Sequence, residues 1–200
     1  MSGVPHGRAG RLWLRQRIEI AEGAVELLQR KLNILRDERD RMKLLATRTE
    51  EAWHRRCAEA DEALLRATLL GGRRVLPPAS GGLLADVTVE HAESMGVSHP
   101  ARIVFTPPGA AAPAPGGTAL TPARRACRAA LEAACAHAAA CAAVATLDAE
   151  VEATGQRVRA IERRRLPRLR KALASIEFAL EEREREDGAR LRRLTTRESS

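Results

Sequence analysis

The sequence predicts a predominantly α-helical protein: a long antiparallel two-stranded coiled coil with a small β-hairpin or irregular lobe in its middle. Alanine fills 38 of the 200 positions and arginine supplies 31 of the 34 basic residues, a composition that favours long helices. Aromatic residues make up only 2% of the chain, so few large side chains are present to build a thick globular core. Glycine and proline gather in one central window and leave long helix-compatible segments on both sides.

That window divides the chain into three parts. Between Gly71 and Pro122 there are eight glycines and eight prolines. We therefore expect an N-terminal coiled-coil helix over residues 1–70, a middle lobe over 71–122 and a C-terminal coiled-coil helix over 123–200. At 1.5 Å per residue, a helix from about Ala9 to about Leu70 in the first segment would be about 90 Å long.

The first segment has apolar residues at steps of three and four, the spacing of a coiled-coil seam. Arg39 interrupts this seam, and a charged residue there can face a carboxylate of the partner helix. The residues predicted for the core on this side are Ile18, Val25, Leu28, Leu32, Leu35 and Met42.

The last segment changes character along its length. Its alanine-rich first half is predicted to pack through one face of small side chains, and its second half carries larger apolar residues. Pro167 removes a helix hydrogen bond and predicts a kink there. The small-residue face comprises Leu131, Ala134, Ala138, Cys141 and Ala145. The larger core residues are Val158, Ile161, Leu166, Leu169, Leu173, Ile176 and Leu180.

The middle lobe contains two short segments with strand-like alternation. Residues 83–90 and 101–106 alternate apolar and polar side chains, which predicts a small β-hairpin. A hairpin alone is marginally stable, so we expect it to lie against the helices. Residues 109–117, rich in alanine, proline and glycine, are typical of an extended linker.

The ends of the chain are basic. The net charge is +8; residues 1–75 carry a net +5 and residues 157–200 a net +6, whereas the middle is acidic. An antiparallel hairpin would bring both ends to one basic pole, which favours an acidic or mixed-charge environment around it.

Several protein classes are disfavoured. The basic N-terminal stretch has no apolar core, which is unlike a secretory signal. The longest uncharged stretch on the predicted helices, residues 133–147, is short and mostly alanine, so we expect no membrane span. The four cysteines have no CxxC spacing, and we expect reduced thiols in the cytoplasm.

The sequence predicts no catalytic, cofactor-binding or metal site. His137 and Cys141, with Cys135 nearby, have helical spacing, but zinc would need a fourth close ligand; packing of small residues explains them better. No glycine-rich phosphate-binding motif occurs, and no nucleophile–base set is evident. Paired carboxylates such as Glu181 and Glu182 lie in a charged tail that is typical of a solvated helix face.

A competing interpretation is a free-standing basic coiled-coil scaffold or a nucleic-acid-associated protein. Residues 163–165 are three arginines, followed by Arg168, Arg170 and Lys171. Stacking aromatics are almost absent, however, and acidic residues are interleaved from Glu177 onward, which is unlike a DNA-binding basic region.

Three blocks of the chain resemble the D subunit of the V-type and A-type rotary ATPases, which is the central-stalk rotor component. Residues 17–31 are similar to the family's N-terminal helix, with Gly23 followed by a Leu-Leu pair and Lys31. The middle block is Met95-Gly96-Val97 with Pro100. Residues 160–191 follow the family's C-terminal block in order and spacing, including Pro167 within the helix. The chain departs from the family at Gly188-Ala189 and in its longer 109–121 stretch.

The resemblance implies a non-catalytic rotor shaft that transmits torque between the catalytic A/B ring and the ion-translocating membrane rotor. Its implied partners are the A and B subunits, the F subunit and the C/d subunit that joins the membrane ring, while ATP and Mg²⁺ are bound by partner subunits. The implied location is the cytoplasmic face of a bacterial plasma membrane, without membrane insertion. The expected contacts with the A/B ring are Arg8, Arg11, Arg15, Arg183, Arg185, Arg190, Arg192 and Arg193.

Overall fold

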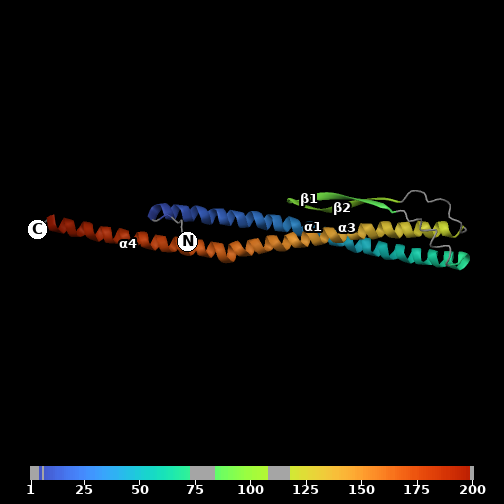
Figure 1. Ribbon diagram of the computed structural model, residues 1–200. Helices are drawn as coiled ribbons and strands as arrows, with labels where there is room; N and C mark the ends of the chain where they lie inside the picture. The colour runs from blue at the N-terminus through green and yellow to red at the C-terminus, as the bar shows by residue number, and fades with distance from the viewer. Residues whose placement is uncertain (1–4, 6, 73–83, 108–117, 199–200) are drawn as a thin grey trace. The chain divides into compact units, whose positions relative to one another are not determined.

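The computed structural model describes residues 5, 7–72, 84–107 and 118–198, without the side chains of 194–198. Its elements follow one another as α1 (Gly7–Gly71), β1 (Asp86–Ser94), β2 (Val97–Thr106), α3 (Leu120–Ala160), the π-helical turn η2 (Ile161–Arg165) and α4 (Leu166–Glu198) (Figure 1). The predicted fold class, helical with a small antiparallel β-hairpin in the middle, is confirmed. The predicted linker at 109–117 lies outside the described residues.

The chain forms two compact units, and both contain parts of the long helices. The first unit combines the chain up to Leu32 with the chain from Glu152 onward, and the second covers Asn33–Val151. The compact units therefore cut across the three sequence segments at 1–70, 71–122 and 123–200.

In the first unit, α1 lies antiparallel to the C-terminal helices. Ala21 and Val25 of α1 form a buried cluster with Val158 of α3 and Leu166 of α4. Half-buried residues pack around this cluster: Ile18, Leu28, Ile161 and Leu169. The apolar spacing of three and four keeps these side chains on one face of each helix, so their burial holds the pair together.

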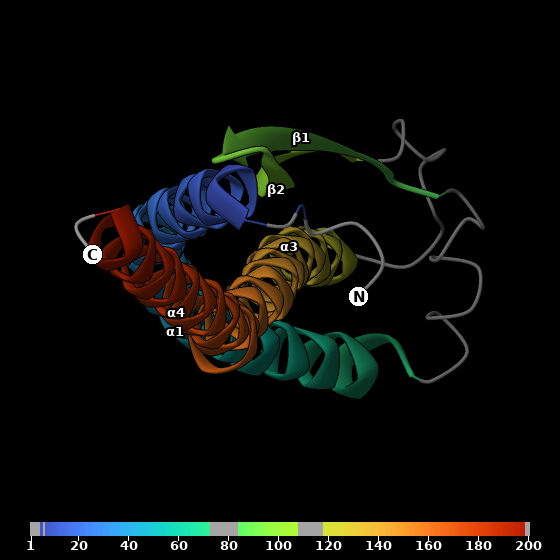
Figure 2. The same ribbon diagram turned by 90° about the vertical axis from the view of Figure 1, so that its left-hand side faces the viewer.

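The second unit has its own core and carries the hairpin. Leu35 and Met42 of α1 pack against Ala143 and Leu147 of α3, and Val97 of β2 covers this cluster. Figure 2 shows β2 on the side of the hairpin toward the helices and β1 on the outside. Every residue of β1 is exposed or half-exposed, whereas β2 includes a buried residue.

The hairpin closes through a two-residue turn at Met95-Gly96. Both residues have positive φ, 51° and 77°, as a type I′ turn requires, and Ser94 pairs with Val97 across it. Glycine adopts such a φ freely, but Met95 does so at a steric cost. The strands extend to this turn, so they are longer at this end than the predicted segments 83–90 and 101–106, and their register shifts between Glu90 and His91.

The interruption predicted at Pro167 takes the form of a π-helical turn. The N–H of Leu166 donates to the carbonyl of Ile161, five residues back. Proline has no N–H, and its ring would clash with the carbonyl four residues before it in a regular helix. A widened turn directly ahead of Pro167 is one way for the helix to accommodate that ring.

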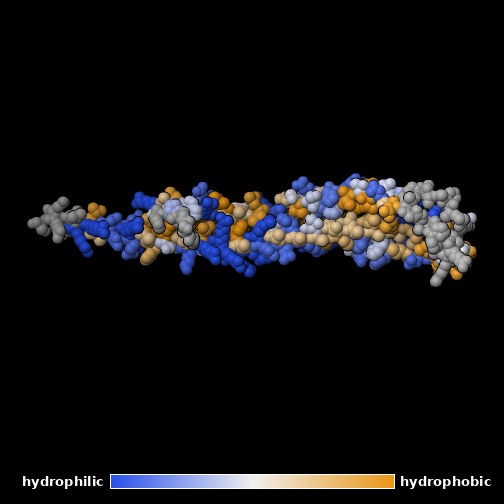
Figure 3. Space-filling model, in the orientation of Figure 1, coloured by the Kyte–Doolittle hydropathy of each residue, from blue (hydrophilic) through white to orange (hydrophobic). Residues whose placement is uncertain are grey.

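The predicted small-residue face of α3 is wrong in phase. Cys141, Ala138, Ala145 and Leu131 are exposed, and Ala134 is half-buried. The buried residues are instead Ala140, Ala143 and Leu147, of which Ala143 and Leu147 pack against α1. Figure 3 shows the pale surface of alanine-rich α3. Alanine offers similar, small contact area on every side of a helix, so the larger Leu147 decides which side faces inward.

One helix of the described residues, Leu120–Arg193, is long and apolar enough by length and composition to cross a membrane. This differs from the expectation drawn from the uncharged stretch 133–147. Core helices of proteins outside membranes share this length and composition. In this structure, part of the same stretch packs against α1 through Ala143 and Leu147.

Candidate shaft and bearing surface

The functional surface suggested by the sequence is the helix pair rather than an active site. Among the described residues, no three His, Cys, Asp or Glu side chains are placed to hold a metal ion together. We therefore build the candidate site from the contacts that join the two helices and from the charges around them.

The side chains of the predicted core residues differ in how much of their surface is buried. Their side chains are buried at Val25, Leu32, Leu35, Met42, Val158 and Leu166. They are half-buried at Ile18, Leu28, Ile161, Leu169, Leu173, Ile176 and Leu180.

The α1 seam from Ile18 to Met42 packs against two different parts of the C-terminal helices. Residues 18–28 meet the 158–169 part of the C-terminal helices, but Leu35 and Met42 meet Ala143 and Leu147. The reason is geometric: in an antiparallel pair, residues further along α1 face residues earlier in the partner helix, so Leu35 and Met42 reach the alanine-rich part of α3.

Polar contacts flank the core of the first unit and fix its register. Arg15 Nη2 donates to Glu177 Oε1 at 2.7 Å, Arg170 Nη2 donates to Glu22 Oε1 at 2.7 Å, and Gln29 Nε2 donates to Glu162 Oε1 at 3.0 Å. The α1 residue numbers rise as the partner numbers fall, which defines the antiparallel direction. These groups are largely exposed, so each pair specifies alignment more than it adds stability.

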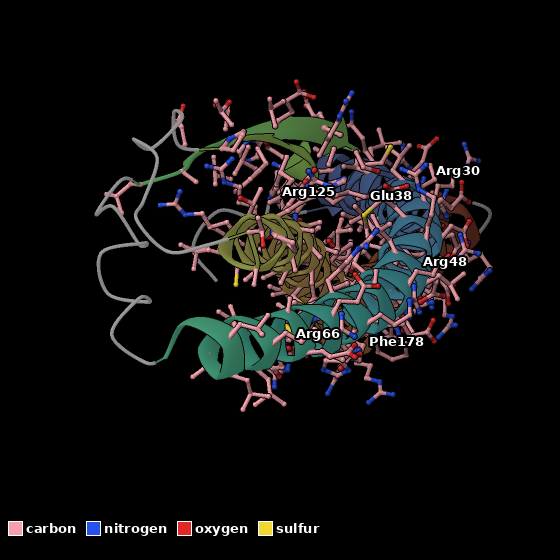
Figure 4. The ribbon with its side chains drawn as sticks, turned by 90° about the vertical axis from the view of Figure 1, so that its right-hand side faces the viewer. Arg30, Glu38, Arg48, Arg66, Arg125 and Phe178 are labelled. Atoms are coloured by element: carbon pink, nitrogen blue, oxygen red, sulfur yellow. The ribbon has the colours of Figure 1, made fainter. Side chains whose placement is uncertain are left out.

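The second unit has a matching set of contacts. Arg39 and Lys43 both approach Asp148, at 3.7 and 3.4 Å, so the charge that interrupts the seam does face a carboxylate of the partner helix. The hairpin is joined to α1 by His99, which is 1% exposed, and its Nε2 lies 3.7 Å from Glu38 Oε1. Figure 4 shows Arg48 on the side of α1 away from α3.

Four of the eight arginines predicted to contact the A/B ring lie next to carboxylates of this chain. Arg8 pairs with Glu184 at 3.6 Å and Arg15 with Glu177. Arg185 lies 3.4 Å from both Glu181 and Glu182, and Arg190 lies 3.9 Å from Asp187. These charges are therefore largely compensated at the surface.

The other four arginines that were predicted to contact the A/B ring differ from one another in their surroundings. Arg11 is half-buried, and its Nε is buried with no hydrogen-bond partner among the described atoms. Arg183 borders a shallow hollow of about 230 Å³ between the start of α1 and α4. Arg193 is exposed, and Arg192 takes part in an interaction within the chain.

A second basic surface surrounds the π-helical turn. None of its residues was among the arginines predicted to contact the A/B ring. Within the described part of the chain, none of its cations forms an ion pair. A hollow of about 370 Å³ is lined by Gln156, Arg159, Ala160, Arg163 and Arg164. The sequence signal is the run of three arginines, on which the competing nucleic-acid interpretation depends. This η2 basic surface comprises Arg159, Arg163, Arg164, Arg165, Arg168 and Lys171.

The positions that carry the family resemblance have distinct local roles. Met95 and Gly96 form the hairpin turn, Val97 packs on the second core, and the carbonyl of Pro100 lies 3.2 Å from His99 Nδ1. Pro167 follows the π-helical turn. Gly23 has open space where a Cβ would lie, and Lys31 is half-buried and partnered within the chain.

Comparison with known proteins identifies the family of this chain. The family model for the ATP synthase D subunit matches residues 12–196. The chain is 32% identical to the V-type ATP synthase D subunit of Anaeromyxobacter sp. (strain Fw109-5), covering 98% of this chain and 95% of that protein. It is 33% identical to the V-type ATP synthase D subunit of Thermus thermophilus, covering 97% of this chain and 88% of that protein. The chain therefore belongs to the family of ATP synthase D subunits.

Proposed function

We propose that this protein is the central rotor shaft of a V-type rotary ATPase or ATP synthase, and that it carries torque between the catalytic A/B ring and the ion-translocating membrane rotor. The observation that carries the proposal is the family match over almost the whole chain, including the C-terminal helix that would lie within the ring. Membership of this family supports a stalk component of a membrane-associated complex.

The mechanical properties of the helix pair suit such a role. A shaft must resist twisting, and an antiparallel pair joined by a shared core shares load between two helices. In the first unit, contacts between the helices recur along their length, from Arg15–Glu177 through the Val25–Leu166 cluster to Gln29–Glu162. Each contact is modest, so stiffness comes from their number.

The charge arrangement suits a surface that must slide. Arg8, Arg15, Arg185 and Arg190 are compensated within the chain, so a surrounding ring gains little by binding them tightly. The η2 basic surface has no ion-pair partner among the described residues and would attract carboxylates of the ring through longer-range, salt-sensitive forces. We infer that this surface, together with the terminal arginines, guides the shaft within the ring.

The proposed role needs no catalytic residue in this chain. ATP and Mg²⁺ would be bound by the A and B subunits, and the F subunit and the C/d subunit would be further partners. The protein would lie at the cytoplasmic face of the membrane as a peripheral part of the complex. Coupling to proton or Na⁺ transport would occur in the membrane sector.

Affinity purification of the tagged chain from its host's membranes tests the proposal. Recovery of A, B and F subunits in fixed proportion, retained through a high-salt wash, supports it. Recovery of nucleic acid that leaves with salt, with no ATPase subunits, would instead support the basic-scaffold interpretation.

A further inference from the structure

The outer strand of the hairpin, β1, has one edge with no strand beside it. Among the described residues the sheet consists of β1 and β2 alone, and Figure 2 shows β1 on the side away from the helices. All nine residues of β1 are exposed or half-exposed. One row of its backbone N–H and C=O groups therefore faces away from β2, without a strand to pair with.

The turn of the hairpin fixes which backbone groups lie on this edge. In a two-residue loop the residues that flank the turn, here Ser94 and Val97, form a hydrogen-bonded pair. Alternate residues counted back from Ser94 therefore face β2, and the residues between them face outward. The extra residue at the register shift, Ala101, belongs to β2, so the alternation along β1 is not interrupted. The outward set comprises Val87, Val89, His91 and Glu93.

The opposite strand agrees with this assignment. Pro100 of β2 pairs in register with His91. Proline has no N–H to donate, so it fits a position where the backbone groups of the pair point away from each other.

β1 lacks two features by which proteins often protect a free edge. Its sequence contains no lysine and no proline. Val87 and Val89 beside the edge are 38% and 40% exposed, so apolar surface is available together with the unpaired backbone groups. A strand of this kind favours the addition of a further strand, in which main-chain hydrogen bonds supply affinity and alternate side chains supply specificity.

The charges of β1 indicate which kind of strand would fit. The strand carries Asp86, Glu90 and Glu93 and no arginine or lysine. Arg102 of β2, which pairs in register with Glu90, is the only arginine or lysine in the two strands. A basic segment would therefore be attracted to the edge. A second copy of β1 would bring its own carboxylates there, and like charges across a strand pair are destabilising.

We propose that the outer edge of β1 binds an extended, basic segment of a partner polypeptide, which adds to the sheet as a third strand. Because side chains alternate between the two faces of a strand, Asp86 and Glu90 lie on one face and Val87 and Val89 on the other. Basic side chains of the partner would lie beside the carboxylates, and apolar ones would cover the valines. Such a docking surface is independent of the rotor role.

Hydrogen exchange of the free, full chain, followed by NMR, tests whether the edge is open. The outward amides of Val89, His91 and Glu93 should exchange at least about tenfold faster than the inward ones. The inward amides for comparison are those of Thr88 and Ala92. Equal protection of the two sets would overturn the proposal, because the chain itself or a second copy would already cover the edge.

A synthetic peptide tests whether the edge accepts a basic strand. The probe is a fluorescein-labelled peptide of about eight residues, in which valine alternates with lysine or arginine. The reference peptide has glutamate in place of each basic residue. By fluorescence anisotropy we expect the full chain to bind the basic peptide at least about tenfold more tightly. Equal binding of the two peptides, or binding of neither, would overturn the proposal.

Variants of the chain separate the backbone from the charges. His91→Pro removes one outward N–H and leaves the hydrogen bonds to β2 in place, so it should weaken binding of the basic peptide at least about tenfold. Asp86→Asn combined with Glu90→Gln should weaken binding by about three- to tenfold. Asp37→Asn combined with Glu50→Gln removes the same charge from exposed positions of α1 and should change the affinity less than about twofold.

The charge variant leaves the backbone unaltered, so it keeps the test decisive if proline disturbs the strand. Cross-strand contacts in the NMR spectrum of each variant show whether the hairpin persists. An affinity that is unchanged by Asp86→Asn with Glu90→Gln in a chain with an intact hairpin would overturn the proposal.

Discussion

Glu22 of α1 accepts a hydrogen bond from Arg170 of α4, with 2.7 Å between Glu22 Oε1 and Arg170 Nη2. The two residues are 148 positions apart in the chain, so this contact defines the register of the antiparallel pair next to the Val25–Leu166 core. Both side chains are about half exposed. The contact therefore sets the alignment of the two helices, while the apolar core beside it holds them together.

A double-mutant cycle of Glu22→Gln and Arg170→Gln measures this pair. We expect a coupling free energy of about 0.2–1 kcal/mol, because exposed ion pairs are well solvated. The coupling should decrease as salt is added, since screening acts on exposed charges. Denaturant unfolding of the four chains gives the value; a coupling that is absent at low salt would show that the pair does not align the helices.

Truncation of the first core should cost far more. Leu166 is 6% exposed and packs against Ala21 and Val25, so Leu166→Ala is expected to lower the free energy of unfolding by about 2–4 kcal/mol through lost burial and a cavity. Leu12 is 65% exposed, and Leu12→Ala serves as the matched control with a change of about 0.5 kcal/mol or less. Equal losses in the two variants would refute the assigned core.

A charge in the seam should affect coupling. Leu169 packs at the edge of the first core, and Leu169→Asp would place a carboxylate between the helices and soften the pair. In the assembled complex we expect ATP hydrolysis to continue while ATP-driven ion pumping falls. Pumping and hydrolysis assays on the same membranes check this, with Glu19→Asp at an exposed position of α1 as a control. Unchanged coupling would contradict the role of the seam.

The thiol of Cys127 gives a pH-dependent prediction. Burial is the main cause that raises its pKa above 9.0, and the charge of Asp61 is the second. A raised pKa in the folded chain means that the stability contributed by this thiol is present below the unfolded pKa and is lost as pH rises through the folded pKa. We expect the decline in stability above about pH 9 to be smaller in Cys127→Ser.

Asp61→Asn isolates the second cause. The ultraviolet absorbance of the thiolate in a Cys127-only chain should titrate at a lower pH once the negative charge is removed. A titration that does not move would show that Asp61 does not act on this thiol.

Residue patterns predicted the helical elements well wherever large side chains recur. Val25, Leu32, Val158 and Leu166 are all buried, because at each of these positions one direction of the helix is much more apolar than the others. The basic character of the 163–165 run was also evident from the sequence, although its position at a π-helical turn was not.

The phase of α3 could not be predicted in the same way. Ala138 and Ala143 are chemically identical, but the first is exposed and the second fully buried. Alternating and periodic patterns carry no information when every face bears the same small side chain. The extent of the hairpin was likewise missed, since the turn at Met95-Gly96 places a residue that is not glycine at a positive φ.

The packing of His137 between Cys141 and Trp53 depended on that phase. With Cys141 placed in the buried face, the two residues were interpreted as packing residues. The structure turns Cys141 outward and sets His137 between it and Trp53. Contacts from α1, over eighty residues away in the chain, supply the groups that orient the imidazole, and no local pattern reveals them.

Rotation of the chain within an immobilised A/B ring tests the central claim most directly. The exposed turn residue Met95 can carry a bead through Met95→Cys in a chain whose native cysteines are changed to serine. If the chain is the rotor shaft, the bead turns in one direction when ATP is added and stops when hydrolysis is blocked. A bead that stays fixed relative to the ring while the bound chain and ring hydrolyse ATP would contradict the account.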